Sequence, residues 1–332
     1  MQRRATITDV AAHAGVSRTT VSLVLADADR IPDETKARVR SSMDEIGYVY
    51  NRAARVARMG TSSLLGLLLT DIRNPFFAEL TMAVDRAAAG HGLSVVQGYS
   101  FGDAEREAAT ARTLAEHVLG GLVLLPTPTS DAAGLMAAAR SQPLVQLLRA
   151  VPGLDSDYVG VDNVTSGRLL GEHLAGRRPG RVVLVGDLAS TQYRDRRLGL
   201  ASGLGLEVEE SLGGADGFRT LLNGIGAGAG AALGGGVPDA VVTYNDTHLL
   251  AVLHALRDKG LRAGEDVAVA SFDNTHIAAD AAPGITSVDH HAAQLAEAAV
   301  RLLVDRMADA SRPLVRVLVA PSLVVRESTL RA

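Results

Sequence analysis

The stretch TITDVAAHAGVSRTTVSLVLAD, residues 6–27, predicts two short helices near the beginning of the chain. Thr6 can cap the first helix, and Asp9, three residues later, favours a helix N-terminus at the same place. Apolar residues then recur over 7–14 at the spacings of a single helix face. Gly15 supplies the tight turn that ends this helix.

The second half of the stretch predicts another helix with a polar leading edge. Ser17 caps it, and Val21, Val24 and Leu25 form its apolar face. Two short helices joined by a glycine turn are a helix-turn-helix, whose second helix places its first residues in the DNA major groove. In this chain those residues are Arg18, Thr19 and Thr20. A generic helical hairpin in a core is the alternative interpretation.

The following segment predicts a third helix and then a linker. Pro32 stands where a first helical residue would, and the apolar residues of DETKARVRSSMDEIG (33–47) have helical spacing up to the closing Gly47. The segment YVYNRAARVARMGTSS (48–63) contains arginines but has no apolar face of its own. This pattern is typical of a linker, or of a helix that forms only on an acidic partner.

Composition limits the classes of protein to consider. A chain of 332 residues predicts two or three domains, and the lack of cysteine excludes a disulfide framework, a thiol nucleophile and a zinc site. Residues 1–60 hold 10 Lys/Arg and 7 Asp/Glu, whereas the remainder holds 23 and 30. A basic head on an acidic body favours a polyanionic partner. We find no signal peptide and no membrane-spanning run, and therefore expect a soluble cytoplasmic protein.

Apolar runs alternate with helical patterns along the rest of the chain, which predicts parallel sheets covered on both faces. The runs are 63–71, 93–100, 120–126, 143–149, 181–187, 239–246 and 266–273. Helical stretches such as 76–90, 103–118, 165–176, 247–259 and 291–308 alternate with them. Ligands of such sheets bind beyond the carboxyl ends of the strands. Asp71, Arg149, Asp246 and Asp273 fall at such ends.

Several motifs in this order resemble the LacI/GalR family of bacterial transcription regulators. They are TDVAAHAGVSRTTVSLVL (8–25), IPDETKARV (31–39), GYVYNRAAR (47–55), GLLLTDIRNPFFAEL (66–80), VGVDN (159–163), AVVTYND (240–246), GEDVAVASFDN (264–274) and PSLVVREST (321–329). The resemblance implies an all-α helix-turn-helix domain over 1–50, a hinge helix over 51–60, and an α/β body of periplasmic-binding-protein type over 61–332. The body would have one subdomain at about 61–158 and 289–319 and another at about 159–288 and 320–332.

The resemblance also implies a set of DNA contacts. They are Thr6, Ser17, Arg18, Thr19, Thr20, Leu23, Tyr48, Asn51, Arg52, Arg55 and Ala57. Arg18 would read a base edge, and Ser17 would hold a phosphate. Two positions depart from the family pattern. Relatives often carry arginine in the slot of Leu23 and leucine in the slot of Ala57, so one base contact and the wedge that bends the duplex are in doubt. Val56 and Met59 are alternative wedges, and a plain linker is the alternative for this segment.

A ligand site is expected between the two subdomains. Its predicted residues are Asp71, Asn74, Phe76, Arg149, Arg196, Asn245, Asp246 and Asp273. Carboxylates, amides and arginines around an aromatic ring suit a sugar, and a purine or another metabolite is the alternative. Some of these residues have structural interpretations. Asp246 and Asp273 can cap helices, Arg196 can be a surface charge, and Phe76 can belong to a core or a dimer contact.

Other patterns give little support to an enzyme. The run NGIGAGAGAALGGG (223–236) resembles a dinucleotide fingerprint but follows a helical pattern, where a strand is required. The side chains of the adjacent residues His290 and His291 diverge, so we interpret them as hinge-crossing or surface residues and not metal ligands. Carboxylates in the cleft could act on a glycoside, but the helix-turn-helix would then be unexplained. We expect no catalytic residue, cofactor or metal.

The predicted function is that of a homodimeric repressor that binds pseudo-palindromic operator DNA under the control of a small molecule. An architectural DNA-binding protein without an effector is an alternative, although it leaves the cleft without a role. No membrane partner is expected.

Overall fold

The chain forms two compact units, Met1–Thr61 (the head) and Ser62–Ala332 (the α/β unit), as expected from the composition. The computed structural model describes residues 5–25, 28–48, 62–117, 119–139, 142–186, 190–211, 213–224 and 236–330. The expected hinge lies outside the described residues. With it lie the predicted DNA contacts Asn51, Arg52, Arg55 and Ala57 and the alternative wedges Val56 and Met59.

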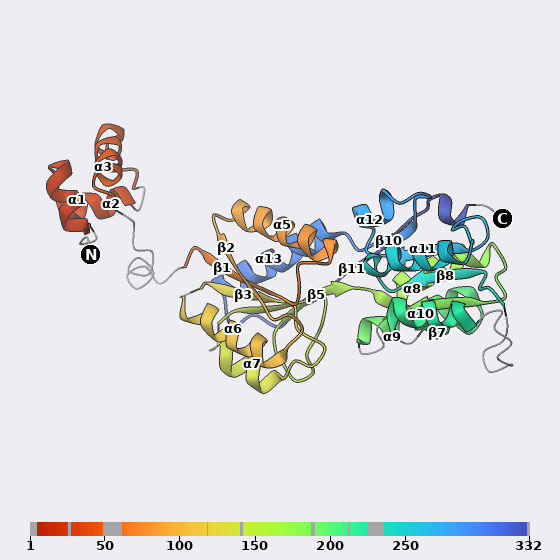
Figure 1. Cartoon of the computed structure of the whole chain (residues 1–332). Coiled ribbons are helices and arrows are strands. Elements are labelled where there is room, and N and C mark those ends of the chain that lie inside the picture. Colours follow the sequence, from red (N-terminus) through yellow and green to blue (C-terminus); the bar gives the residue numbers. More distant parts are fainter. Residues whose placement is uncertain are drawn as a thin grey trace. The chain divides into compact units, whose positions relative to one another are not determined.

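The head contains the three predicted helices, α1 (Ile7–Ala14), α2 (Arg18–Leu25) and α3 (Asp33–Glu45) (Figure 1). The Thr6 hydroxyl accepts a hydrogen bond from the Asp9 amide, while the Asp9 carboxylate accepts one from the Thr6 amide. Gly15 ends α1 with a φ of 65°, a conformation that favours glycine. Pro32, which we predicted as the first helical residue, stands instead at the N-cap of α3, one position before its first helical residue, Asp33.

One small core holds the three helices of the head together. Its buried members are Val10, Ala11, Ala14, Val21, Val24 and Val39. The first two residues of α2, Arg18 and Thr19, take no part in this core, since both are exposed. The predicted helix-turn-helix is therefore confirmed, with its leading polar residues open to solvent.

The α/β unit contains two six-stranded sheets. The first has the order β2 (Ser94–Tyr99), β1 (Leu64–Leu69), β3 (Gly121–Leu124), β4 (Leu144–Leu147), β5 (Asp157–Val161) and β11 (Arg316–Val319), all parallel. The second has the order β7 (Glu209–Ser211), β6 (Val182–Val185), β8 (Ala240–Thr243), β9 (Ala268–Phe272), β10 (Thr286–Asp289) and β12 (Ser322–Val324), in which β12 runs antiparallel to β10.

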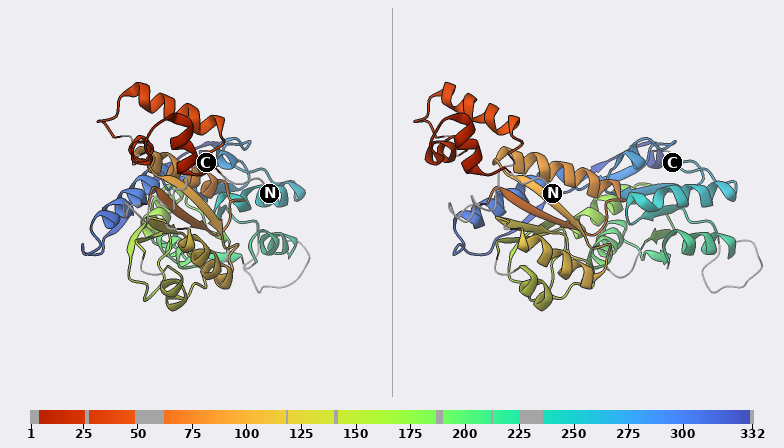
Figure 2. Two further views of the ribbon diagram at one scale, coloured as in Figure 1. Left: turned by 90° about the vertical axis from the view of Figure 1, so that its left-hand side faces the viewer. Right: turned by 60° about the vertical axis from the view of Figure 1, so that its left-hand side comes forward.

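Helices cover both faces of the first sheet, which explains why β1 is apolar without alternation. Leu65, Leu67 and Leu69 of β1 pack beneath α5 (Pro75–Gly90) and α13 (Ala292–Ala308), which lie side by side (Figures 1 and 2). Leu68 points the other way, towards α6 (Ala104–Glu116) and α7 (Ala132–Ala139). Alternate residues of one strand therefore belong to two cores.

The second sheet has the same three layers. One face packs on α8 (Asn163–Ala175) and α9 (Thr191–Leu204). The other packs on α10 (Gly214–Gly224), α11 (Leu249–Asp258) and α12 (His276–Ala279). Short 3₁₀ turns lie at η1 (Asp246–His248) and η2 (Glu327–Thr329). The predicted two-subdomain α/β architecture is confirmed. No helix among the described residues is long and apolar enough to cross a bilayer.

The chain passes between the two sheets at three places in the described residues: from β5 to α8, from β10 to α13 and from β11 to β12. The sequence placed the first boundary between the subdomains at about residue 158. In the structure the crossing follows Val161, because β5 is paired with β11 up to that residue. These crossings connect two sheets, and residues that follow strands of both sheets line a common cleft.

Candidate functional site

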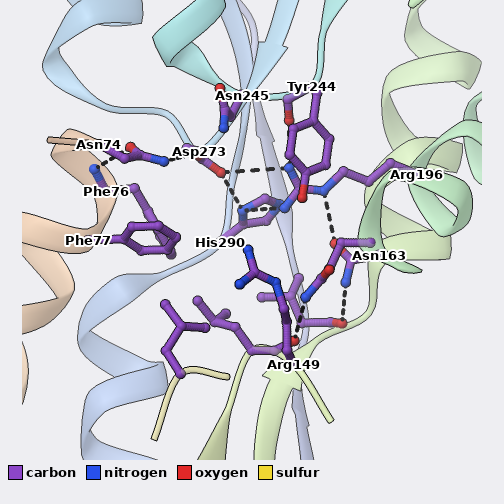
Figure 3. A pocket seen from close by; sticks show the side chains of 14 residues that line it. Asn74, Phe76, Phe77, Arg149, Asn163, Arg196, Tyr244, Asn245, Asp273 and His290 are labelled. Atoms are coloured by element: carbon purple, nitrogen blue, oxygen red, sulfur yellow. Dashed lines mark hydrogen bonds and ion pairs between the residues drawn. The ribbon is translucent and has the colours of Figure 1, made fainter. Parts of the chain in front are cut away.

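A cleft of about 560 Å³ lies within the α/β unit and is lined from both sheets (Figure 3). Its lining residues are Asn74, Phe76, Phe77, Leu125, Leu148, Arg149, Val161, Asn163, Gln192, Arg196, Tyr244, Asn245, Asp273 and His290.

The helix that carries Arg196 is fixed by close backbone packing between α8 and α9. A Cβ added at Gly199 would lie 2.0 Å from the carbonyl oxygen of Val164, and one added at Gly167 would lie 2.1 Å from that of Arg196. Gly171 and Gly203 are equally crowded by backbone of the facing helix. Only glycine permits this approach, which sets the position of Arg196 at the cleft.

The guanidinium of Arg196 is held on several sides. Its Nε donates to Asn163 Oδ1 at 2.9 Å and its Nη1 to the Tyr244 carbonyl oxygen at 2.6 Å. Its Nη1 also lies 3.8 Å from the Asp273 carboxylate. The rings of Tyr244 and Phe272 lie 4.7 and 4.9 Å from its central carbon, at cation–π distance. Arg196 is therefore a preorganised cation and not a surface charge.

The carboxylate of Asp273 connects the two sides of the cleft. His290 Nδ1 lies 3.2 Å from its Oδ1, and Asn74 Nδ2, at the start of α5, donates to its Oδ2 at 3.4 Å. Burial alone would raise the pKa of Asp273, but the His290 hydrogen bond and the Arg196 charge outweigh it, so the pKa is below its ordinary value. Asp273 is therefore ionised at neutral pH.

His290 is a neutral acceptor towards the cleft. Burial lowers the pKa of its imidazole, and the charge of Arg196 lowers it further. His290 Nδ1 lies 3.2 Å from Asp273 Oδ1 and 3.5 Å from Arg196 Nη2, and the neutral tautomer that donates its Nδ1 proton to the carboxylate keeps a lone pair on Nε2. The structure thus adds His290 to the cleft, whereas the sequence had suggested the hinge or the surface for this residue.

The opposite wall is aromatic and apolar. Phe76 is 3% exposed and belongs to the core of the first sheet, with its ring 5.9 Å from that of His290 in an edge arrangement. Phe77 is half-buried and lines the cleft beside it. Phe76 thus has both roles that we considered, core packing and a cleft wall.

Arg149 enters the cleft from the end of β4 (Figure 3). Its Nη1 donates to the Pro126 carbonyl oxygen at 2.7 Å. The preceding residue, Leu148, has a φ of 63°, and its carbonyl oxygen accepts a hydrogen bond from Gln192 Nε2 at 3.1 Å. This bond links the first sheet to α9.

Buried polar atoms without partners concentrate in the cleft. Among the residues that the structure describes, four such side-chain atoms have no hydrogen-bond partner. Three of them belong to cleft residues: Arg149 Nε, Gln192 Oε1 and His290 Nε2. Buried polar groups are costly to leave unpaired, so a donor, an acceptor amide oxygen and an imidazole lone pair in one cleft favour a polar ligand.

Six of the eight predicted ligand residues line the cleft. They are Asn74, Phe76, Arg149, Arg196, Asn245 and Asp273. Asp71 does not line it, because its carboxylate pairs with Arg73 of the same turn at 2.6 Å. Asp246 does not line it either. It is fully buried, and its Oδ2 accepts hydrogen bonds from the Thr275 amide and hydroxyl at 2.7 and 2.8 Å.

Four further polar residues of the cleft were missed by sequence reasoning: Asn163, Gln192, Tyr244 and His290. Tyr244 precedes two predicted residues, and Asn163 ends the VGVDN motif, so the sequence did contain a signal for both. Gln192 has none, since it lies in a helix that hydrophobic periodicity does not reveal. Among the described residues, no group of three or more His, Asp or Glu could hold a metal ion.

Some of the predicted DNA contacts of the head are exposed, and others form helix caps or pack within the head itself. Arg18 and Thr19 are exposed at the start of α2, and Leu23 is half-buried outside the core of the head. Ser17 and Thr20 bond to each other, with Ser17 Oγ accepting from the Thr20 amide at 3.0 Å, so Ser17 caps α2. Thr6 is exposed in its own cap, and Tyr48 packs on the core.

Comparison with known proteins identifies both units. Residues 6–51 match the bacterial regulatory proteins of the lacI family, and residues 172–329 match the periplasmic binding protein-like domain. The chain is 31% identical to the HTH-type transcriptional regulator CelR of Thermobifida fusca, over 98% of this chain and 99% of that protein. It is 29% identical to the ribose operon repressor of Escherichia coli (strain K12), over 98% and 99%. A crystal structure of the Lac repressor dimer bound to operator and the anti-inducer ONPF superposes with a TM-score of 0.82 at 25% identity, covering 99% and 100%.

Proposed function

Because the chain belongs to the lacI family of bacterial regulatory proteins, we propose that it represses transcription by binding a specific operator under the control of a small molecule in the cleft. The observation that carries the effector part is the cluster of three unpartnered polar atoms, Arg149 Nε, Gln192 Oε1 and His290 Nε2. Since these atoms come from both sides of the cleft, a ligand that satisfies them would hold the two subdomains together.

A polyhydroxylated ligand of the sugar class fits the cleft best. The ionised Asp273 accepts hydroxyl protons, and Arg196 and Asn245 donate to hydroxyl oxygens. The similar ribose operon repressor and the similar structure of a CelR–cellobiose complex agree with this class. A purine is the alternative that the same donors and acceptors permit.

The DNA part of the proposal rests on the exposed start of α2. Arg18 and Thr19 would face base edges in the major groove, and Ser17 with nearby amides would contact the phosphate backbone. The similar Lac repressor binds operator as a dimer. We propose that this chain also acts as a homodimer on a pseudo-palindromic site, because a two-fold pair of heads reads two half-sites.

Ligand binding would act through the two subdomains and not through a reaction. The carboxylate of Asp273 is held in an ion pair, and its part in the proposal is to bind. A ligand that prefers one subdomain arrangement shifts the population and so changes operator affinity. We propose a regulator and not an enzyme, located in the cytoplasm with its DNA.

Two measurements on the full chain test the proposal. Selection from a random duplex library should yield a pseudo-palindromic consensus, and recovery of unrelated sequences would contradict sequence-specific binding. A thermal-shift screen of sugars, sugar phosphates and nucleosides should raise the melting temperature with one class. Asp273→Ala should abolish that shift, whereas Asp280→Ala, at an exposed carboxylate outside the cleft, should keep it. Equal shifts in both variants would remove Asp273 from the site.

A further inference from the structure

We infer that the molecule bound in the cleft carries an anionic group, a carboxylate or a phosphate, that pairs with Arg149. This inference rests on the proposed function, because it specifies the chemical class of the same effector. It follows from the charges that line the cleft and from what surrounds each of them.

The cleft has an excess of positive charge. Among the described lining residues, two are arginines, Arg149 and Arg196, and one is a carboxylate, Asp273. Arg196 lies 3.8 Å from Asp273, and His290 also bonds to that carboxylate. The negative charge of Asp273 is thus committed to Arg196, and no other carboxylate that lines the cleft pairs with the guanidinium of Arg149.

The groups that contact Arg149 are neutral. Its Nη1 donates to the carbonyl oxygen of Pro126, and the Tyr244 hydroxyl is its other hydrogen-bonding neighbour. The carboxyl that acts on Arg149 electrostatically is Glu107, which raises the pKa of Arg149 but does not line the cleft. Glu107 Oε1 accepts a hydrogen bond from the Thr127 amide at 2.7 Å. Arg149 Nε remains buried without a partner.

The residue beside Arg149 makes the local chemistry more specific. Leu148 lines the cleft with an apolar side chain, so this end of β4 supplies a cation and no acid. An arginine fork pairs bidentately with carboxylate or phosphate oxygens. A neutral polyol would leave the charge of Arg149 unpaired as it displaced water, which is costly. An oxyanion would supply the missing charge and an acceptor for Nε.

Matched ligands test this inference by isothermal titration calorimetry with the full chain at constant ionic strength. The probes are ribose, ribonate and ribose 5-phosphate; glucose, gluconate and glucose 6-phosphate; and adenosine and AMP. At least one anionic probe should bind at least about tenfold more tightly than its neutral counterpart, because hydrogen bonds to charged groups are the stronger ones. Preferential binding of ribonate or gluconate would identify the anionic group as a carboxylate, and preferential binding of a sugar phosphate or AMP would identify it as a phosphate.

Two variants assign the preference to Arg149. Arg149→Gln should abolish it, whereas Arg301→Gln, at an exposed arginine of α13 outside the cleft, should keep it. Leu148→Asp should move the preference towards neutral probes, because it places a carboxylate beside Arg149. Aspartate tolerates the positive φ of this position better than most residues, so the variant should fold.

The outcomes separate this inference from the proposed function. Tight binding of a neutral probe with weaker binding of its anionic counterparts would overturn the inference and support an effector cleft. An anionic preference that survives Arg149→Gln would also overturn it. Binding of none of the probes would contradict both the inference and the sugar or purine class proposed for the cleft.

Discussion

The buried carboxyl of Asp246 should make the stability of the α/β unit depend on pH, and Asp246→Asn should remove this dependence. Burial, followed by the charge of Asp273, raises the pKa of Asp246 from 3.8 to about 6. A carboxyl whose pKa is higher in the folded chain binds its proton more tightly there, so the folded chain loses stability as pH rises between these values. At about 1.4 kcal/mol per pKa unit, the free energy of unfolding should fall by about 3 kcal/mol across this window.

Asparagine at this position keeps an oxygen that can accept the Thr275 hydrogen bonds, and it cannot ionise. The free energy of unfolding of Asp246→Asn minus that of the unaltered chain should therefore rise by about 2–3 kcal/mol between pH 4 and pH 7. Urea unfolding followed by far-ultraviolet circular dichroism measures this difference, with the exposed Asp280→Asn as the control. If the difference in the free energy of unfolding for Asp246→Asn stays constant over this range, Asp246 is not a buried carboxyl with a raised pKa.

Two other substitutions test the helix contact and the DNA surface. Gly199→Ala should destabilise the α/β unit by about 1–3 kcal/mol, because its Cβ would lie 2.0 Å from the Val164 carbonyl oxygen; unchanged urea unfolding would mean that α8 and α9 lie further apart. Arg18→Ala should relax discrimination at one base pair of each half-site by about 1–3 kcal/mol, measured with single-base operator variants. The exposed Arg38→Ala is the matched control, and equal discrimination in both variants would remove Arg18 from the base contacts.

Patterns of apolar residues predicted much of the fold. The seven apolar runs correspond to β1, β2, β3, β4, β6, β8 and β9, because strands covered on both faces are apolar throughout. The helix α9 was not among the predicted helices. Its buried face consists of Gln192, Tyr193, Arg196, Gly199 and Leu200, which have helical spacing but little hydrophobicity. Hydrophobic periodicity cannot detect a helix that packs through glycine and polar side chains.

The sequence predicted which residues lie at the converging ends of strands. It did not predict which of their side chains point into the cleft. The rule that ligands bind beyond strand ends selected Arg149 and Asp273, and both line the cleft. It could not tell which strand-end carboxylates point into the cleft. Asp71 turns back to the Arg73 amide of its own turn, and Asp246 turns inward to the Thr275 amide at the start of α12. Such choices depend on side-chain geometry that spacing along the chain does not encode.

The measurement that tests the central proposal most directly is the operator affinity of the full chain with and without its effector. Fluorescence anisotropy with the selected duplex should show a change of about 5–150-fold at saturating effector, the usual range of coupling between two sites. Asp273→Ala should bind the operator as tightly as the unaltered chain and show no change with effector. An operator affinity that effector leaves unaltered, or a response that Asp273→Ala retains in full, would contradict control through the cleft.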